Sequence, residues 1–372
     1  MNRMMNNLRR GELLGRGAGF SLVEVLIAVV VLSLGLLGLA AVFPAVLTQQ
    51  KQASDASLGA ATARSAQAFL QQSPLSEKSP VYDTNGALLD LTSGQGTLQR
   101  RGWDQLTAAL SSNPWSPKEE WTTASDQPIF EVNADTGDIK IGVITSEVVQ
   151  IKLIDRLSPR PYGGAGESPR YVWDFAARRI SAPEFGRAST GLHTPTAQDS
   201  VQVAIFVRRI DNMIRVPEGK TLNDVLTGTN LTNVASRRLP VAQDGTGRPT
   251  YDGVGAGGTG ALNYSDIKRI SYTLGTTLGP GGYETISFPT GGLSEYAQQL
   301  GQKFVDQFGV VHTVTEVIVD TTGPSPVNKG VKLSPPVASD IALMAPNSAE
   351  GTPQMLFTVQ IPVAVLVFEE RR

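Results

Sequence analysis

The chain has 372 residues, a formal net charge of −2 and no cysteine. The lack of cysteine excludes disulfides and thiolate metal or redox centres, and His193 and His312 alone are too few for a multi-histidine zinc site. A mildly acidic chain of this kind gives no reason to expect nucleic-acid binding. Its length is enough for two domains.

The N-terminal region begins basic and then becomes apolar. Residues 1–19 carry four arginines and one glutamate, and Val25–Phe43 follows with no charged side chain and one hydroxyl group, on Ser33. At about 1.5 Å per residue, such a helix is as long as the roughly 30 Å hydrocarbon core of a bilayer is thick. The sequence therefore predicts one transmembrane helix, and the basic residues before it predict a cytoplasmic N-terminus.

One acidic residue, Glu24, stands at the start of this apolar run, and the next ionisable residue is Lys51. A carboxylate costs about 2.5–3.5 kcal/mol at the bilayer centre and still needs a reason near the interface. One explanation is that Glu24 lies at headgroup depth, where the positive end of the helix dipole favours a negative charge.

A more specific explanation comes from the residues before it, Gly19-Phe20-Ser21-Leu22-Val23-Glu24. This segment resembles the processing site of type IV prepilins and type II secretion pseudopilins, in which a leader ends in Gly and the fifth mature residue is Glu. The resemblance implies that a prepilin peptidase cuts after Gly19 and that the new amine of Phe20 is methylated. It also implies that Glu24 pairs with the Phe20 amine of a neighbouring subunit, since opposite charges attract strongly in an apolar bundle.

Two features of this region leave alternatives open. A secretory signal peptide has an apolar region of about 7–15 residues and a small-x-small cleavage site; Gly38 and Ala40 could serve, but the run here is longer and includes Glu24. The kink-forming proline of many family members is about the twenty-second mature residue, whereas Pro44 is the twenty-fifth counted from Phe20.

The helix is predicted to continue through residues 45–72 and to end at Ser73-Pro74. From Phe20 to Gln72 it would be roughly 80 Å long. We expect its apolar side to lie on the sheet of a head domain and its other face to meet neighbouring subunits. The residues assigned to the apolar side are Leu47, Ala53, Leu58, Ala61, Ala68 and Phe69.

The next part of the chain mixes loops with short strands. Residues 73–127 are rich in loops, with one short helix predicted at Trp103–Leu110, and Trp115 and Trp121 are expected to cover the edge of a core. Strands are predicted at Pro128–Val132, Ile139–Ile144 and Glu147–Ile154, the first two forming a hairpin.

The turn of that hairpin holds Asp135 and Asp138. Some pseudopilins bind calcium in their heads, but two Asp residues in a hairpin turn are more typical of turn chemistry than of a calcium site.

Two later segments resemble each other: Arg170–Ile180 and Val201–Ile210 each form an apolar run that ends in Arg-Arg-Ile. They are predicted to pair as antiparallel strands at the centre of the head. The pair also resembles, more weakly, a pattern in large minor pilins of the PilV type. The four arginines could form a basic patch for a partner, although strand-end arginines usually point into water. These arginines are Arg178, Arg179, Arg208 and Arg209.

The chain from residue 217 onward is predicted to contain loops, one helix and two strands. Residues 217–282 are loops whose glycine clusters lack the frame of a phosphate-binding loop. Leu293–Phe308 is an amphipathic helix that Gly309 ends, and Val310–Val319 is a strand. Met355–Phe368 is one buried strand, because Pro362 and the shortness of the run argue against a second membrane helix.

The sequence thus predicts an α+β protein with a type IV pilin-like fold, in which a long N-terminal transmembrane helix packs on an antiparallel β-sheet head with large loop insertions. Its parts are a leader at 1–19, the helix at 20–72, spanning the membrane at about 22–43, and the head at 73–372.

The expected function is that of a minor pilin or pseudopilin subunit of a type IV pilus or a type II secretion pseudopilus. It would sit in the inner membrane with its head in the periplasm or outside the cell. Its expected partners are the prepilin peptidase and other subunits, and no cofactor, metal, nucleic acid or small-molecule substrate is expected. Neither histidine lies in a nucleophile motif, so an enzyme is not expected. The alternative is a membrane-tethered binding or adhesion protein that uses a pilin-like N-terminus for export.

Overall fold

The structure is a computed structural model. It describes residues 21–72, 78–79, 99–100, 115–117, 130–132, 139–141, 149–160, 168–180, 200–216, 239–242, 267–275, 278–279, 281–289, 293–320, 327–339 and 353–371. The chain divides into two compact units, Met1–Ser54 and Asp55–Arg372.

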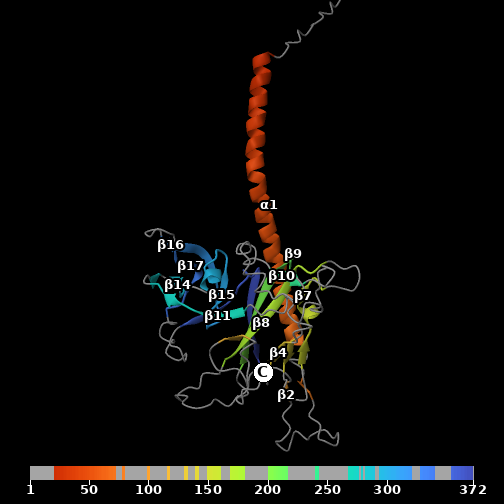
Figure 1. Cartoon of the computed structure of the whole chain (residues 1–372), viewed down its shortest axis with the longest axis vertical. Helices are drawn as coiled ribbons and strands as arrows, with labels where there is room; N and C mark the ends of the chain where they lie inside the picture. Colours follow the sequence, from red (N-terminus) through yellow and green to blue (C-terminus); the bar gives the residue numbers. More distant parts are fainter. Residues whose placement is uncertain are drawn as a thin grey trace, which may run out of the picture. The chain divides into compact units, whose positions relative to one another are not determined.

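Helix α1, Leu22–Gln72, belongs to both units and confirms the predicted long N-terminal helix (Figure 1). Pro44 lies inside it. Two hydroxyl groups of α1 are satisfied within the helix, since Ser33 Oγ donates to the Val29 carbonyl at 2.7 Å and Thr48 Oγ1 to the Pro44 carbonyl at 2.8 Å. Such back-bonding leaves no hydroxyl group unsatisfied on the apolar surface.

The second unit is built on a six-stranded sheet with the antiparallel pair β8 and β9 at its centre (Figure 1). β8 and β9 pair from Tyr171↔Arg209 to Ile180↔Ser200, which confirms the predicted pairing of the two similar segments. The strands of this sheet are β8 (Tyr171–Ile180), β9 (Ser200–Val216), β19 (Ala364–Arg371), β10 (Leu239–Ala242), β3 (Ser116–Pro117) and β7 (Leu157–Ser158). The 3₁₀ helix η3 (Leu153–Arg156) comes directly before β7.

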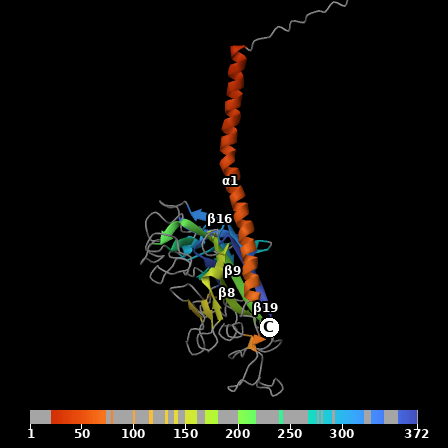
Figure 2. The same ribbon diagram turned by 90° about the vertical axis from the view of Figure 1, so that its right-hand side faces the viewer.

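The part of α1 that belongs to the second unit, residues 55–72, is called the head-packed part here. It lies along one face of this sheet, beside β8, β9 and β19 (Figure 2). Side chains at alternating positions of both strands, such as Trp173 and Ile205, pack against Ala63, Ala66 and Leu70. A helix that places small residues against a sheet can approach it closely, and the hydrophobic core forms at this contact.

Our prediction of which side of α1 is buried is wrong. Leu58 is 44% exposed, and Ala53, Ala61 and Ala68 are exposed; only Phe69 packs partly against the core. The buried residues are Gly59, Thr62, Ala63, Ala66 and Leu70. Close approach explains this choice, because a Cβ atom added to Gly59 would lie 2.7 Å from Val363 Cγ2.

The other face of the six-stranded sheet is covered by an eight-stranded sheet. Ala176, Ala204 and Phe206 of the first sheet pack against Val305 and Leu356 of the second. The strands of the second sheet are β11 (Ile267–Ser271), β12 (Thr273–Leu274), β13 (Leu278–Gly279), β14 (Gly282–Ser287), β15 (Lys303–Val305), β16 (Val311–Asp320), β17 (Val327–Val337) and β18 (Gln354–Thr358). The second unit therefore has a helix–sheet–sheet arrangement.

The predicted helix at Leu293–Phe308 is wrong. Only α5, Ser294–Ala297, is helical, and Lys303–Val305 forms β15, which pairs with β16 and β18. Phe304 and Val305 are fully buried in different core clusters on opposite faces of the sheet, which is the alternation of a strand. Gly309 has a φ of +86° and lies in the turn between β15 and β16 rather than at the end of a helix.

The predicted single strand at Met355–Phe368 is also wrong in part, because it forms two strands in two sheets. β18 belongs to the eight-stranded sheet and β19 to the six-stranded sheet. Pro362 lies between them, where the missing N–H group is not needed by a strand ladder. The strand predicted at Val310–Val319 is confirmed as β16.

A small third sheet confirms the predicted hairpin, with β4 (Phe130–Val132), β5 (Ile139–Ile141) and β6 (Val149–Ile151) all antiparallel. A two-stranded sheet joins β1 (Lys78–Ser79) to β2 (Gln99–Arg100). The predicted loop segment 217–282 contains β10 to β13, so that prediction is wrong where these strands lie. The predictions for Trp103–Leu110, Trp121, Asp135, Asp138 and His193 fall outside the described residues.

Candidate functional site

The start of α1 is a reciprocal capping box formed by Ser21 and Glu24. The Ser21 N–H donates to Glu24 Oε2 at 3.1 Å, and the Glu24 N–H donates to Ser21 Oγ at 3.4 Å. This pairing satisfies two backbone donors that a helix start leaves open. The S-x-x-E spacing in the sequence could have revealed the role of Ser21, which our sequence analysis missed. Gly19 and Phe20 lie outside the described residues.

The apolar part of α1 has no buried residue. Every side chain from Leu22 to Phe43 is exposed, and α1 is the one helix in the described part of the chain that is long and apolar enough to cross a membrane. A continuous surface of large aliphatic side chains is unstable in water and requires lipid or partner helices.

The head-packed part of α1 begins at Asp55, which contacts both central strands. Tyr171 Oη donates to Asp55 Oδ1 at 2.9 Å, and Arg209 forms an ion pair with Asp55 Oδ2. Burial, together with the hydrogen bond and the negative charge of Asp55, raises the pKa of Tyr171 to about 12. Arg209 therefore belongs to the helix–sheet contact rather than to an open basic patch.

Arg208 is fully buried, so it neither points into water nor contributes to a basic patch on the surface. Its guanidinium group lies 3.8 Å from Asp174 Oδ2, and Arg156 lies 3.6 Å from the same oxygen. Asp174 and Arg208 alternate with the residues that face α1, so their side chains lie on the face away from the helix. Buried charges of this kind persist only where they are paired.

Arg178 is also buried and does not point into water. Its Nε–H donates to Gln202 Oε1 at 2.6 Å, and its guanidinium carbon lies 4.9 Å from the centre of the Trp115 ring. Burial lowers the pKa of Arg178 to about 10, and the nearby charge of Asp306 opposes this shift. Trp115 is buried as predicted for a residue at a core edge. The side chain of Arg179 is outside the described set.

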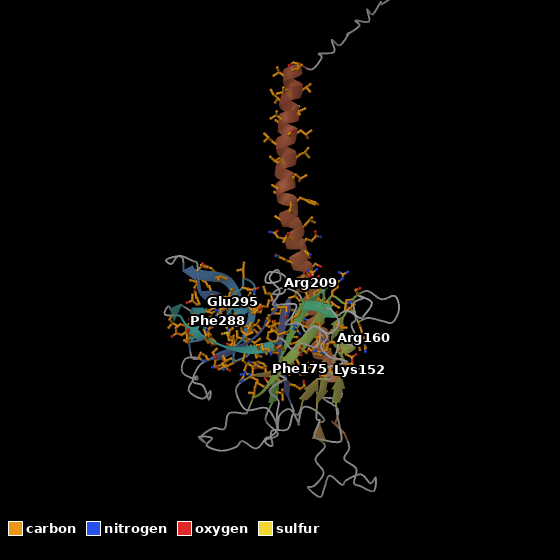
Figure 3. All side chains as sticks on the ribbon, in the orientation of Figure 1. Lys152, Arg160, Phe175, Arg209, Phe288 and Glu295 are labelled. Carbon is orange, nitrogen blue, oxygen red and sulfur yellow. The ribbon has the colours of Figure 1, made fainter. Side chains whose placement is uncertain are left out.

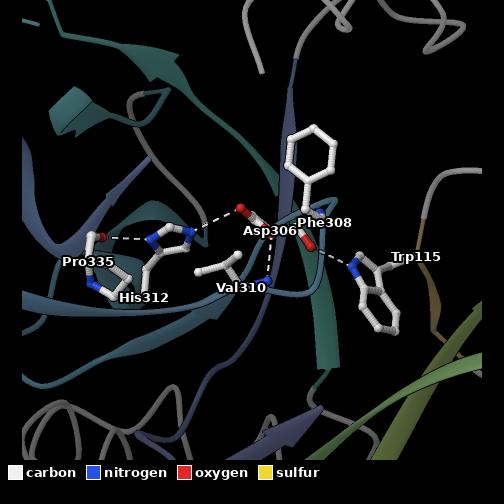
Figure 4. Close-up of polar contacts among 6 residues, drawn as sticks. All are labelled: Trp115, Asp306, Phe308, Val310, His312 and Pro335. Carbon is white, nitrogen blue, oxygen red and sulfur yellow. Dashed lines mark hydrogen bonds and ion pairs between the residues drawn. The ribbon is translucent and has the colours of Figure 1, made fainter. Parts of the chain in front are cut away.

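Asp306 organises the turn between β15 and β16 (Figure 4). Its Oδ1 atom accepts hydrogen bonds from the Phe308 and Val310 N–H groups, both at 2.8 Å, and its carbonyl accepts one from Trp115 Nε1 at 2.6 Å. Its Oδ2 atom lies 3.1 Å from His312 Nε2.

The other ring nitrogen of His312, Nδ1, lies 2.8 Å from the Pro335 carbonyl oxygen. A carbonyl oxygen can only accept, so Nδ1 carries the proton in this contact. Both ring nitrogens are therefore engaged by the fold, and the pair stabilises the turn between β15 and β16. Among the described residues, no group of three or more His, Asp or Glu side chains could hold a metal ion.

These features define a class of protein: a membrane-anchored protein whose long N-terminal helix is apolar in its first part and packs on a largely antiparallel β head in its second. A family model described as the prokaryotic N-terminal methylation motif matches residues 15–40. The chain is type IV pilin-like: it carries the prepilin motif on the apolar start of α1.

This motif is that of a prepilin-like protein processed by a prepilin peptidase, and it points to a structural subunit. No curated protein matches the chain. No solved structure matches it either. The match does not extend to β8 and β9, so the likeness of these strands to PilV-type pilins stays a prediction.

Proposed function

We propose that the chain is a minor pilin or pseudopilin subunit of a type IV pilus or a type II secretion pseudopilus. In this proposal a leader of residues 1–19 is removed, Phe20 becomes the methylated N-terminus, residues 20–72 form the assembly helix and residues 73–372 the head. The helix lies in the inner membrane with its start on the cytoplasmic side. The observation that carries the proposal is Glu24, which stands at the start of a helix whose first part, Leu22 to Phe43, has no buried side chain.

The capping box supports a role for Glu24 in assembly. Cleavage after Gly19 would leave the Phe20–Ser21 peptide bond intact, so the Ser21 N–H group would still hold Glu24 Oε2. The box directs the carboxylate toward the N-terminal end of the helix, which is where processed chains carry their cationic amine. A carboxylate and an amine that meet in an apolar helix bundle stabilise each other, whereas either charge alone is strongly disfavoured there.

The size of the head supports a minor subunit. The second unit contains two stacked sheets with α1 on one of them, and this bulk would be hard to repeat at every position of a thin filament. If filaments released by shearing consist mainly of this chain, the proposal of a minor subunit is wrong.

Three variants separate the charge of Glu24 from its capping role. Glu24→Gln keeps an acceptor for the Ser21 N–H but removes the charge. Ser21→Ala keeps the charge but removes the serine half of the capping box. Glu24→Ala removes the charge and the acceptor for the Ser21 N–H together. The charge-pair proposal expects both Glu24 variants to be lost from the purified filament or secretion complex, while Ser21→Ala still assembles. Glu295→Gln, an exposed carboxylate on α5, is the matched control for charge.

The readout is the amount of chain that copurifies with the assembled complex, with the membrane level of each variant measured in parallel. Normal assembly of Glu24→Gln would contradict charge pairing. Normal assembly of all three variants would instead favour the alternative, a membrane-tethered binding protein.

A further inference from the structure

A pocket of about 220 Å³ lies between the head-packed part of α1 and the segment that runs from η3 to β8. All of its lining residues belong to the second unit. Its aromatic wall consists of the partly buried Phe69 backed by Trp173, which is 3% exposed. The remaining lining combines Ala66 and Leu157 with an ion pair and three hydroxyl groups.

The aromatic wall is held in place by the fold. The ring centres of Phe69 and Trp173 are 5.9 Å apart, and the rings are tilted by 58°. Trp173 Nε1 donates to the Asp155 carbonyl at 3.2 Å, which fixes the orientation of the indole. A wall that is already formed loses little conformational entropy when a ligand binds.

Among the described residues that line the pocket, the one positive and the one negative side chain balance each other. Asp155 and Arg160 form an ion pair in which Arg160 is 50% exposed and Asp155 14% exposed. Arg160 is labelled in Figure 3. A guanidinium group has five N–H donors and a carboxylate has several acceptor positions, so both groups keep hydrogen-bonding capacity after pairing. Thr62 Oγ1 donates within the protein, to the Leu58 carbonyl at 2.9 Å and to Ser158 Oγ at 3.2 Å. The hydroxyl groups of Ser65 and Ser158 add donors and acceptors to the lining.

We propose that this pocket binds one neutral sugar ring. A pyranose has an apolar C–H face that fits an aromatic wall and a rim of hydroxyl groups that both donate and accept hydrogen bonds, as the ion pair and the hydroxyl side chains require. The volume favours a single ring, since pockets for drug-sized ligands are about 300–1,000 Å³. The internal charge balance favours a neutral ring over a phosphorylated or carboxylated one.

This proposal does not rest on filament assembly, because the pocket lies entirely in the second unit and would serve a pilus subunit and a tethered binding protein equally. Its test therefore uses binding as the readout. An effect on binding and an effect on assembly can be distinguished in the same preparations.

The experiment measures the binding of methyl glycosides of glucose, galactose, mannose and N-acetylglucosamine to the full chain in a detergent without a sugar headgroup. Saturation-transfer NMR detects the bound ring, and Trp fluorescence follows the pocket through Trp173. Glucuronic acid and glucose 6-phosphate are the anionic comparison. We expect saturable binding of at least one neutral glycoside and weaker binding of both anions.

Two pairs of variants locate the site. Ser65→Leu places a larger side chain at the pocket from an exposed helix position, and Ala68→Leu makes a similar change at an exposed position of α1 outside the pocket. Arg160→Leu removes the donor group, and Arg170→Leu removes an exposed arginine that does not line the pocket. We expect binding to weaken about tenfold or more in Ser65→Leu and Arg160→Leu and to stay unchanged in the two controls.

The proposal is overturned if none of the neutral glycosides binds in a saturable manner, or if only the anions bind. It is equally overturned if Ser65→Leu and Arg160→Leu bind as the unmodified chain does. Circular dichroism of each variant confirms that the fold is retained, and the exposed position of Ser65 keeps this control independent of core packing.

Discussion

The two parts of α1 solve the same problem of apolar surface in opposite ways. Residues 22–43 carry large aliphatic side chains, all exposed, whereas residues 55–72 place small side chains and Leu70 against the β8–β9 sheet. The apolar side chains of the first part are not covered by any described residue of the chain, so they require lipid or partner helices. The second part obtains its environment from the head, so one continuous helix depends on two different sources of stability.

The largest expected effect comes from placing a charge in each part. Ala63→Arg puts a cation into the packed helix–sheet contact, and we expect the head to lose about 3–5 kcal/mol of stability, as for other uncompensated buried charges. Leu32→Arg should leave the stability of the head unchanged and instead cost about 2.5–3.5 kcal/mol of membrane insertion.

Urea unfolding of the detergent-solubilised chain, followed by the fluorescence of the buried Trp115 and Trp173, measures the first quantity. Membrane fractionation measures the second. A head destabilised by Leu32→Arg would contradict the division of α1 into two independent parts.

A second pair of substitutions compares two leucines of the same helix. Leu70 is 0% exposed and Leu58 is 44% exposed. Leu70→Ala should cost about 2–5 kcal/mol of unfolding free energy because it leaves a cavity, whereas Leu58→Ala should change it by less than about 0.5 kcal/mol. The same unfolding experiment checks both values, and equal losses would show that the helix packs by another face.

The contact between Tyr171 and Asp55 should make the stability of the head fall at alkaline pH. The pKa of Tyr171 is raised to about 12 in the folded protein from an ordinary value near 10, so the unfolded chain gives up this proton first. The stability that depends on the neutral phenol is therefore complete below about pH 10 and is lost as the pH rises toward about 12.

Tyr171→Phe should remove this part of the pH dependence and cost about 1.5 kcal/mol at neutral pH, since Asp55 keeps its pair with Arg209. Unfolding at a series of alkaline pH values tests both effects. An unchanged alkaline slope in the variant would assign the loss of stability to other groups.

The smallest expected effect is at the start of the apolar part. Ser21→Ala removes the side-chain half of the capping box and should weaken the first helical turn by about 1 kcal/mol. Amide hydrogen exchange of Leu22 to Val25 in micelles should quicken about fivefold, while exchange in the packed part stays constant. Ser33→Ala is the control, because its hydroxyl group bonds only within the helix interior.

The elements that the sequence predicted well are those whose pattern is local and strong. The uninterrupted apolar run gives a helix by length and composition, and the two runs ending in Arg-Arg-Ile give two strands by their β-branched and aromatic residues. The prepilin motif was visible because it combines several residues at fixed spacing.

The errors occurred where distant residues decide the structure. Tyr296, Leu300 and Phe304 have a helical spacing, but pairing with β16 and β18 draws Phe304 into a strand. Arg208 is buried because Asp174 lies on the same face of the neighbouring strand, which no local pattern shows. The buried face of α1 was mispredicted because hydrophobicity was weighted above the small size that close packing requires.

The pocket was equally invisible in the sequence, since it joins residues of α1 to residues nearly a hundred positions away. The capping box, in contrast, was present as a short motif and could have been found.

Intact mass and N-terminal sequencing of the chain purified from membranes bear most directly on the proposed processing and assembly. We predict that the chain begins at Phe20 and carries one added methyl group on its amine. A chain that begins at Met1 has no such amine beside Glu24, and one that begins at Ala41 has lost the apolar helix; either result would contradict the proposed role of Glu24.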